Sequence, residues 1–531
     1  MRSETTTVDP VRQAEGTAVN QAAVIAFLSS ADAYGGMAAV ERIDTHTSVL
    51  FLVDARVFKL KRALRYDYLD YSTVERRREC CLAEVRLNRR TAPSLYHRVV
   101  PVTLDHAGSL ELGGNGQAIE WLVEMSRFEE SSLLDRLAER GALELTLMAD
   151  LAHAVARFHA IAEWRFDHGG RRGMAWVIDG NADGFHEYGG GALDAADCRQ
   201  LTTLSHATLD QQADRLMTRR AQGCVRRCHG DLHLRNVCLL DGRPTLFDCI
   251  EFSDDIACID VLYDVAFLVM DLLHRGLPRH AHEVCNEYVT ATCDIDGLAL
   301  MPLFLSVRAA VRAKTSATAA RMQPTPEAQA REQQAARDYL AFALSALHPV
   351  PASLVAIGGL SGTGKSVAAR HVAPNIGAAP GALVLRSDVV RKSLLGVPAA
   401  DRLGSEGYTE GVTRRVYREM AARAATAVAA GRAVIVDAVF ADPRDRTVIA
   451  EVARAADVPF TGVWLEAPVD TRIDRVQQRS GDVSDATPAV LREQCTKPLG
   501  HLEWSHVDAG GDRDATARAV TVLVGTTTTR R

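Results

Sequence analysis

Apolar positions follow two different patterns along this chain, and the change comes near residue 350. Before it, apolar residues recur mainly at helical spacing, which predicts amphipathic helices. The clearest helical segments are 145–161, 194–220, 259–273 and the region from there to about residue 346. After residue 350, short apolar runs that predict strands alternate with helical stretches. We expect those strands at 354–358, 382–385, 433–436, 460–465 and near 519–524. Strands separated by helices predict a parallel sheet covered on both faces.

The first part of the chain also contains strand patterns, and they come in hairpins. The spacing predicts one hairpin over 48–61, turning at Asp54-Ala55, and another over 237–247, turning at Asp241-Gly242. A helix is predicted from Thr73 to Arg90, ended by Pro93. These patterns predict an α+β domain.

A domain boundary is predicted at His348-Pro349-Val350-Pro351, because two prolines flanking a valine break any helix. A chain of 531 residues needs two or three folding units. We expect an N-terminal tail at 1–18, a first domain at 19–347, a linker at 348–352 and a second domain at 353–531.

Charge and composition disfavour nucleic acid and membranes as partners, since either would need a local basic patch. The net charge of −6 provides no basic surface for nucleic acid or an anionic membrane. The eleven cysteines form no Cys-x-x-Cys pair, residues 1–18 lack the apolar core of a secretory signal, and no run of about 18 apolar residues occurs. The sequence therefore predicts a cytoplasmic protein with free thiols, and it leaves the oligomeric state open.

The first candidate site is the segment His229-Gly230-Asp231, followed by Asn236 and, twelve residues later, by Asp248. Phosphoryl transfer to a hydroxyl needs a proton acceptor and hard oxygen ligands for Mg²⁺, and this spacing supplies both. Asp231 is predicted to be the base, with Asn236 and Asp248 as metal ligands. The alternative is a simple turn, with His233 as a solvated surface histidine.

These motifs resemble the aminoglycoside phosphotransferase and choline kinase group, which is distantly related to protein kinases. The run 228–272 is similar to a bacterial subfamily in which this domain is fused to an ATP-binding domain. The resemblance covers most of residues 20–345 and implies a protein-kinase-like fold, with a small β-lobe followed by a helical lobe. It places the first acceptor pocket between about 165 and 225. The pair Asp260 and Asp264, one helical turn apart, is interpreted as capping a helix and bracing the catalytic loop.

A kinase-type β-lobe also supplies a strand lysine for the α and β phosphates of ATP and a helical glutamate that orients it. Lys59 and Lys61 are two residues apart and share a face of their strand, so both remain candidates. Glu84 is the better glutamate candidate and Glu79 the weaker, and both could instead belong to a solvated helix face. Without a Gly-x-Gly-x-x-Gly loop, the turn at 45–48 is expected to cover the phosphates.

The second candidate site is a complete Gly-x-x-x-x-Gly-Lys-Ser motif between a predicted strand and a predicted helix. Its backbone N–H groups are predicted to cradle phosphates, with Lys365 on the β and γ oxygens and Ser366 on Mg²⁺. The expected nucleotide-binding residues are Gly359, Ser361, Gly362, Thr363, Gly364, Lys365 and Ser366.

Further residues suggest that this P-loop belongs to a kinase. Asp388 follows the second strand and could deprotonate a hydroxyl, and Arg391 could hold its charge. Asp437 ends the third strand as a Walker B-like acid for Mg²⁺. The loop at 507–512 is expected near the adenine. Asp388 could alternatively be a helix N-cap.

Three arginines at helical spacing are expected to close over the transferring phosphate, namely Arg472, Arg475 and Arg479. They could instead form an exposed helix face. Residues 352–525 resemble P-loop kinases, which include gluconate and shikimate kinases, polynucleotide 5′-kinase domains and zeta toxins. The Ser387-Asp388-x-x-Arg391 pattern is closest to the last two groups.

The leading hypothesis is a bifunctional kinase that uses ATP and Mg²⁺ to phosphorylate hydroxyl groups of small molecules at two sites. Two alternatives stay open. One domain could bind nucleotide only to regulate the other, or the P-loop domain could act on a nucleotide sugar or a nucleic-acid 5′ end. The acidic charge disfavours a nucleic-acid substrate.

Overall fold

The computed structural model describes residues 21–36, 39–66, 68–398, 401–478, 484–496 and 498–528. The chain divides into two compact units, one formed by 1–176 with 213–271 and the other by 177–212 with 272–531. The domain boundary expected at 348–352 stays a prediction.

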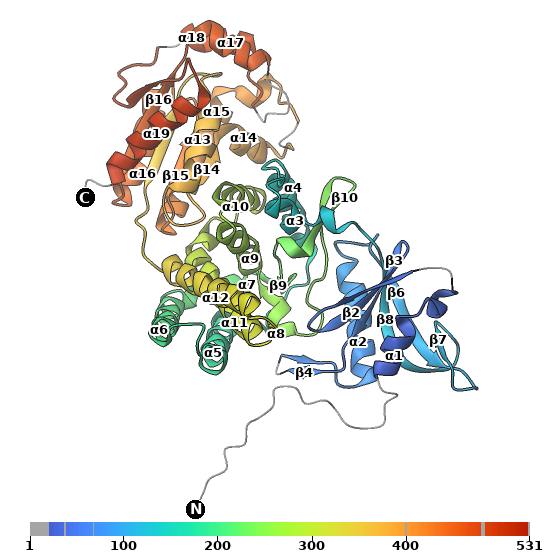
Figure 1. The fold of residues 1–531 in the computed structure, drawn as a ribbon. Helices are drawn as coiled ribbons and strands as arrows, with labels where there is room; N and C mark the ends of the chain where they lie inside the picture. The colour runs from blue at the N-terminus through green and yellow to red at the C-terminus, as the bar shows by residue number, and fades with distance from the viewer. Residues whose placement is uncertain are drawn as a thin grey trace, which may run out of the picture. The chain divides into compact units, whose positions relative to one another are not determined.

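The first unit is built on a six-stranded antiparallel sheet, in the order β1-β2-β3-β8-β6-β7 (Figure 1). Helix α1 (Gln21–Leu28) covers one face, where it meets Phe58 and Leu60, and α2 (Val74–Asn88) covers the other. Because side chains alternate along a strand, Lys59 and Lys61 face α2. The strands are β1 (Val40–Asp44), β2 (Ser48–Val53), β3 (Arg56–Lys61), β6 (Tyr96–Leu104), β7 (Leu110–Leu112) and β8 (Gln117–Ser126).

The predicted hairpin over 48–61 and the helix after Thr73 are confirmed, and Thr73 is the N-cap of α2. Strands β6 and β8 were not predicted. Their alternation is hidden because β8 buries two carboxylates, Glu120 and Glu124, among its apolar residues, and β6 contains a proline.

The rest of the first unit carries the catalytic-loop region. The short strand β9 (Val225–Arg227) pairs with β12 (Cys258–Asp260), and the second predicted hairpin is present as β10 (Val237–Leu240) and β11 (Arg243–Leu246). Around them lie α3 (Leu134–Glu139), α4 (Leu147–Ile161), α7 (Ala213–Ala221), α8 (Asp254–Ala257) and the first part of α9 (Val261–His274). The helix predicted over 194–220 is two helices, because α6 (Ala195–Gln211) ends at Gln211 before α7 begins.

The second unit contains a five-stranded parallel sheet in the order β14-β15-β13-β16-β17, as predicted for a P-loop domain. Helices α13 (Lys365–Val372) and α19 (Arg513–Thr528) cover one face, and α15 (Glu410–Ala429) and α16 (Pro443–Ala455) the other (Figure 1). The strands are β13 (Leu354–Gly358), β14 (Leu383–Arg386), β15 (Val434–Asp437), β16 (Phe460–Glu466) and β17 (Ser505–Asp508). This unit also holds α6, α10 (Pro278–Thr292), α11 (Met301–Arg321) and α12 (Pro326–Ala346).

The last predicted strand, near 519–524, is wrong, because those residues lie in α19 and the fifth strand is β17. The run contains several β-branched residues, but its buried positions are Ala517, Val520 and Val524, which is helical spacing.

Strand β14 lies at the edge of the parallel sheet, and side chains of α10 occupy its outer hydrogen-bonding groups. The Val384 N–H donates to Asn286 Oδ1 at 2.9 Å, and His282 Nε2 lies 2.8 Å from the Ala382 carbonyl oxygen. Burial lowers the pKa of His282 to about 4, so this histidine is neutral at physiological pH and donates its proton to the carbonyl.

Across the part of the chain that the structure describes, no helix combines the length and apolarity needed to cross a membrane. All eleven cysteines are free thiols. The cytoplasmic location stays a prediction.

Candidate active sites

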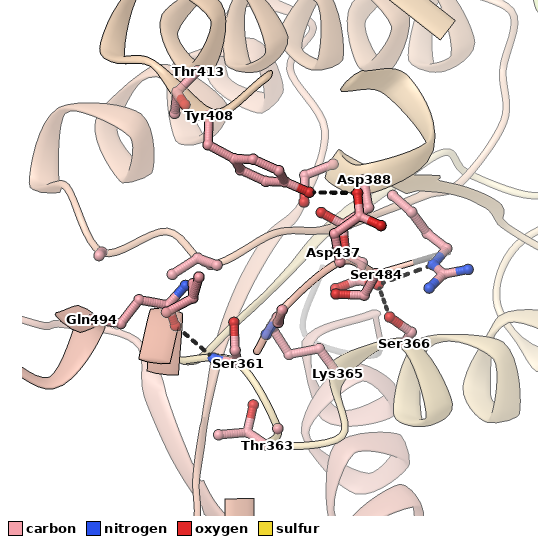
Figure 2. Close-up of a pocket in the computed structure, with 18 of the residues that line it drawn as sticks. Ser361, Thr363, Lys365, Ser366, Asp388, Tyr408, Thr413, Asp437, Ser484 and Gln494 are labelled. Carbon is pink, nitrogen blue, oxygen red and sulfur yellow. Dashed lines mark hydrogen bonds and ion pairs between the residues drawn. The ribbon is translucent and has the colours of Figure 1, made fainter. Parts of the chain in front are cut away.

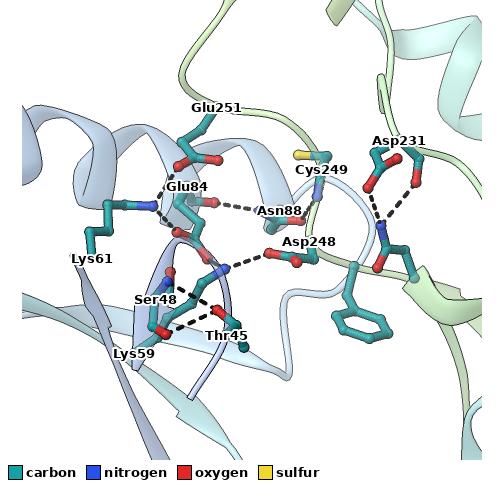
Figure 3. Close-up of polar contacts among 12 residues, drawn as sticks. Thr45, Ser48, Lys59, Lys61, Glu84, Asn88, Asp231, Asp248, Cys249 and Glu251 are labelled. Atoms are coloured by element: carbon teal, nitrogen blue, oxygen red, sulfur yellow. Dashed lines mark hydrogen bonds and ion pairs between the residues drawn. The ribbon is translucent and has the colours of Figure 1, made fainter. Parts of the chain in front are cut away.

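Two strand lysines of the first unit converge on one helical carboxylate (Figure 3). Lys59 Nζ lies 2.8 Å from Glu84 Oε1 and 2.6 Å from Asp248 Oδ1, whereas Lys61 Nζ lies 2.5 Å from Glu84 Oε2. The Lys59 side chain is 14% exposed and that of Lys61 only 1%. Lys59 is therefore the lysine beside the predicted metal ligand, and Lys61 lies behind it. The weaker candidate, Glu79, is exposed on α2.

Charge keeps this cluster ionised although it is buried. Burial alone would raise the pKa of Glu84, but Lys59 and Lys61 lower it to about 2. Burial would lower the pKa of each lysine, and the neighbouring carboxylates raise both above the usual lysine range. The site thus holds a fixed array of charges of the kind that binds a polyphosphate and its metal.

The predicted catalytic loop is held by Asp264, at the start of α9. Its two carboxylate oxygens accept the backbone N–H groups of His229 at 3.0 Å and Gly230 at 2.9 Å, and His159 Nε2 lies 3.1 Å from the same carboxylate. The predicted brace is confirmed for Asp264. The predicted helix cap is confirmed for Asp260, because its Oδ1 accepts the Leu262 N–H in the first turn of α9 at 2.9 Å. The same carboxylate forms a buried pair with Arg219, at 2.7 and 2.8 Å.

Asp264→Ala is expected to destabilise the first unit by about 3 kcal/mol or more, because it leaves the buried N–H groups of His229 and Gly230 without an acceptor. Chemical denaturation of the full-length protein measures this loss. Asp264→Asn keeps one acceptor oxygen and is expected to lose less. Equal stability of Asp264→Ala and wild type would contradict the bracing role.

Hydrogen bonds also tie the catalytic loop to the segment that carries Asp248. His229 Nε2 lies 2.9 Å from the Phe247 carbonyl oxygen, and the Ile250 N–H donates to the His229 carbonyl at 2.9 Å. Asp248 has a left-handed backbone, with φ of 59°, and its N–H donates to the Tyr96 hydroxyl. These bonds bring the predicted metal ligand to the loop of the predicted base.

Asp231 is accessible, with 37% of its side chain exposed. Asn236 Nδ2 donates to Asp231 Oδ2 at 3.0 Å, which leaves the amide oxygen of Asn236 available for a metal ion. His233 was interpreted as a possible solvated histidine, but its side chain is 13% exposed and its Nε2 lies 3.3 Å from Asp231 Oδ2. His233 is therefore a neighbour of the predicted base, which the motif alone did not indicate.

The P-loop of the second unit needs glycine for two reasons. A Cβ on Gly359 would lie 2.6 Å from the Leu465 carbonyl oxygen, and one on Gly362 would lie 2.6 Å from the Arg472 carbonyl oxygen. Gly364 has no such neighbour but has φ of 92°, a conformation that side chains disfavour. Residues 361–366 line a cavity of about 1290 Å³, whereas Gly359 does not reach it.

The cavity joins the P-loop to the predicted Walker B-like acid (Figure 2). Ser366 Oγ donates to Asp437 Oδ2 at 2.5 Å, and Lys365 Nζ donates to the Leu360 carbonyl oxygen at 3.2 Å. Asp437 sits at the C-terminal end of β15, next to β13. A hydroxyl and a carboxylate placed together are oxygen ligands that fit Mg²⁺.

Asp388 faces the same cavity from the first turn of α14 (Ser387–Leu395). The N-cap of this helix is Arg386, so the alternative in which Asp388 caps the helix is wrong. Burial raises the pKa of Asp388, and the nearby charge of Asp437 adds to this, against opposing effects of Ser484 and Arg386. A raised pKa suits a carboxylate that must accept a proton during a reaction.

If Asp388 is the base, the rate at the second site should rise with pH through a pKa above that of ordinary aspartate, because only the deprotonated carboxylate accepts a proton. The dependence of kcat/KM on pH measures this limb. Asp445 also lines the cavity, and burial raises its pKa to about 6, so Asp445→Asn is the control. If the rise of kcat/KM with pH disappears in Asp445→Asn, the titrating group is Asp445, and Asp388 is not the base.

The predicted arginines are placed differently from one another. Arg391 is buried, donates to the Gly407 carbonyl oxygen at 2.8 Å and lies 4.7 Å from the Tyr408 ring centre. Arg475 donates to the carbonyl oxygens of Ala509 and Gly511, in the loop predicted near the adenine. Arg472 does not share that face, because it is buried against the Cys495 sulfur. Arg479 lies outside the described residues.

Sequence reasoning missed the residues that approach the cavity after position 483. Gln494, on α18 (Pro488–Thr496), accepts the Ser361 N–H of the P-loop at 2.9 Å (Figure 2). Asp485 accepts the Tyr408 hydroxyl at 2.9 Å and lies 3.4 Å from Lys392 Nζ. No local motif marks these residues, because their partners are distant in the sequence.

Two protein-family models match this chain, one over each of the regions that contain a candidate site. Residues 56–296 match the model of the phosphotransferase enzyme family, and residues 354–497 match the model of an AAA domain. The first region is therefore a phosphotransferase-family domain with the kinase-like fold, and the second is a P-loop domain. The chain is a kinase, which confirms the class predicted from its motifs.

The similarity to relatives extends over both regions. An uncharacterized protein of Mycobacterium tuberculosis and one of Mycobacterium bovis are each 29% identical to this chain over 480 residues, covering 89% of this chain and 92% of each relative.

Among solved structures, a choline/ethanolamine kinase family protein from Mesorhizobium loti covers 61% of this chain and 98% of its own, with 14% identity and a TM-score of 0.35. A gluconokinase from Sinorhizobium meliloti covers 34% of this chain and 94% of its own, with 20% identity and a TM-score of 0.25. The Mycobacterium tuberculosis APS kinase CysC covers 33% and 99%, with 21% identity and a TM-score of 0.26.

Proposed function

We propose that this chain is a bifunctional kinase with two separate sites, each of which transfers the γ-phosphate of ATP to a hydroxyl group of a small molecule. The observation that supports the proposal is that each compact unit brings together a lysine, side-chain oxygens of the kind that bind Mg²⁺ and a further carboxylate. Each of these groups lies within hydrogen-bonding reach of another member of its set or lines the same cavity.

At the first site, Lys59 binds the α and β phosphates and Glu84 orients it. Asn236 and Asp248 hold Mg²⁺, which screens the charge of the phosphates. Asp231 accepts the proton of the acceptor hydroxyl. The hydroxyl oxygen forms the new bond to the γ-phosphorus while the bond from that phosphorus to ADP breaks. Asn236 keeps Asp231 in place through the 3.0 Å hydrogen bond.

At the second site, the N–H groups of residues 361–366 and the N-terminus of α13 bind the phosphates. Lys365 binds the β and γ oxygens, and Ser366 with Asp437 holds Mg²⁺. Asp388 accepts the proton of the second acceptor, and Arg391 contributes positive charge beside it. Arg475 and Arg479 are the arginines that we propose to close over the transferring phosphate.

Turnover at both sites is favoured over a purely regulatory nucleotide site. A binding-only site has no use for a proton acceptor, yet Asp231 is accessible beside the metal ligands and Asp388 lines the cavity with a raised pKa. If the acceptor at the second site is a nucleotide sugar or a nucleic-acid 5′ hydroxyl group, the reaction is the same transfer of phosphate to a hydroxyl.

Nucleotide stoichiometry tests the two-site proposal. Calorimetric titration of the full-length protein with a non-hydrolysable ATP analogue and Mg²⁺ should give two sites per chain. Lys59→Ala and Lys365→Ala should each leave one, and the double variant should leave none. ADP release in the presence of sugars, amino sugars, nucleosides and aminoglycosides then assigns an acceptor to each site. A single wild-type site, or one activity abolished by both variants, would contradict the proposal.

A further inference from the structure

A second ion-pair cluster lies directly behind the lysine of the first site (Figure 3). Lys61 Nζ contacts Glu84, at 2.5 Å, and also contacts Glu251. The Tyr71 hydroxyl donates to the same oxygen of Glu251. The side chains of Lys61 and Glu251 are 1% and 5% exposed, so these charges have little access to water. Such buried charges are costly unless they are paired, so their presence needs a reason.

Glu251 belongs to the segment that carries the predicted metal ligand. Asp248 lies three residues before it, and the segment is attached at two further points, where the Asp248 N–H donates to Tyr96 and the Cys249 N–H donates to Asn88. Asp248 has a left-handed backbone that most side chains avoid, so the segment must be held by its surroundings. Glu251 fixes its far end to β3 through Lys61.

The same lysine also acts on the other side of the site. Glu84 is shared, with one oxygen on Lys59 and the other on Lys61. Lys61 therefore determines which oxygen of Glu84 remains for Lys59, and Lys59 in turn contacts Asp248 at 2.6 Å. The contacts form a closed circuit from Lys61 through Glu84 and Lys59 to Asp248, and back through the backbone to Glu251.

From this circuit we infer that Lys61 and Glu251 are positioning residues for the Mg²⁺ and nucleotide site of the first unit. They do not touch the nucleotide. They keep the Asp248 carboxylate and the Lys59 ammonium in fixed positions relative to each other. The carboxylate is therefore already in place when Mg²⁺ binds. The inference rests on the proposed function of the first site.

The test measures Mg²⁺ dependence at the first site alone. In full-length protein carrying Lys365→Ala, binding of a fluorescent ATP analogue is followed at increasing Mg²⁺. Glu251→Gln and Lys61→Met are expected to raise the Mg²⁺ concentration at half-saturation by about tenfold or more, as loss of an outer-shell partner does at metal sites. Tyr71→Phe, which removes one hydrogen bond to Glu251, should shift it in the same direction by less.

Glu120→Gln is the matched control. Glu120 forms an equally buried pair with Arg77 in the same lobe, at 2.7 Å. Gln21 donates to Glu120 and to the Lys61 carbonyl oxygen, and Arg77 donates to the Tyr71 carbonyl oxygen, so these links reach only the backbone of the cluster and leave its charged side chains untouched. Glu120→Gln should lower the melting temperature as Glu251→Gln does and leave the Mg²⁺ dependence unchanged. A Mg²⁺ dependence in Glu251→Gln equal to that of Glu120→Gln would overturn the inference. If Lys61→Met does not fold, the Mg²⁺ dependence of Glu251→Gln and Tyr71→Phe tests the inference.

The same assay separates this inference from the proposed function. Lys59→Ala in the Lys365→Ala background should no longer bind the analogue. If it binds as tightly as its parent, the assignment of the first nucleotide site fails, whatever the result for Glu251→Gln. If Lys59→Ala loses binding and Glu251→Gln behaves as Glu120→Gln, only the positioning role fails.

Discussion

Asp231→Asn is expected to slow phosphoryl transfer at the first site by about 10²–10⁴-fold, the range that a positioned general base contributes. The substitution keeps the size of the side chain and an oxygen that can accept from Asn236 Nδ2, now 3.0 Å from Asp231 Oδ2. Binding of the ATP analogue with Mg²⁺ should therefore be retained. The measurements are acceptor-dependent ADP release and nucleotide affinity, made on the same preparation.

Asp241→Asn provides the control for this substitution. Asp241 is exposed in the turn between β10 and β11 and has a left-handed backbone, which asparagine tolerates. Its replacement should leave the rate and the affinity as in wild type, and activity at the second site should be unchanged in both variants. An unaltered rate in Asp231→Asn would remove Asp231 from the role of base.

Lys365→Ala should slow turnover at the second site by at least about 10²-fold, because the positive charge on the transferring phosphate is lost. The lysine lines the cavity at the start of α13, where its Nζ contacts a carbonyl oxygen of the P-loop. Nucleotide affinity at this site should also fall, because the ammonium contacts ground-state phosphates as well. Single-turnover rates and nucleotide titration separate the two effects.

Arg370→Ala is the companion variant, since Arg370 is an exposed cation on the same helix and does not line the cavity. It removes one positive charge from α13 without touching the P-loop. Equal losses in both variants would show that net charge on the helix, and not Lys365, produces the effect.

The P-loop and the catalytic loop could be predicted because their functional groups lie within a few residues of one another. The sequence could not decide between Lys59 and Lys61. Both lie on the same face of β3, and they differ in which carboxylate of a distant segment they contact. Asp248 meets the first, and Glu251 meets the second. Gln494 and Asp485 were missed for the same reason, because their partners come from residues 361 and 408.

The fold was predicted best where local pattern and burial coincide. Strands β13, β14 and β15 are buried throughout, β16 is buried in its second half up to Leu465, and all four appear as apolar runs. Strand β17 has a single buried residue, Val507, and no such signal. Strand β8 was hidden by Glu120, whose charge is acceptable in the sheet only because Arg77 of α2 neutralises it. Such compensation depends on tertiary contacts and leaves no periodic trace in the sequence.

The hydrogen bonds from α10 side chains to β14 determine where a C-terminal fragment of this protein can begin. A fragment beginning after residue 350 would lack Asn286 and His282, and would leave the Val384 N–H and the Ala382 carbonyl without those partners. An uncovered outermost strand can join strands from other molecules, so such a fragment should self-associate. A fragment that begins before Pro278 retains the helix and should stay dispersed.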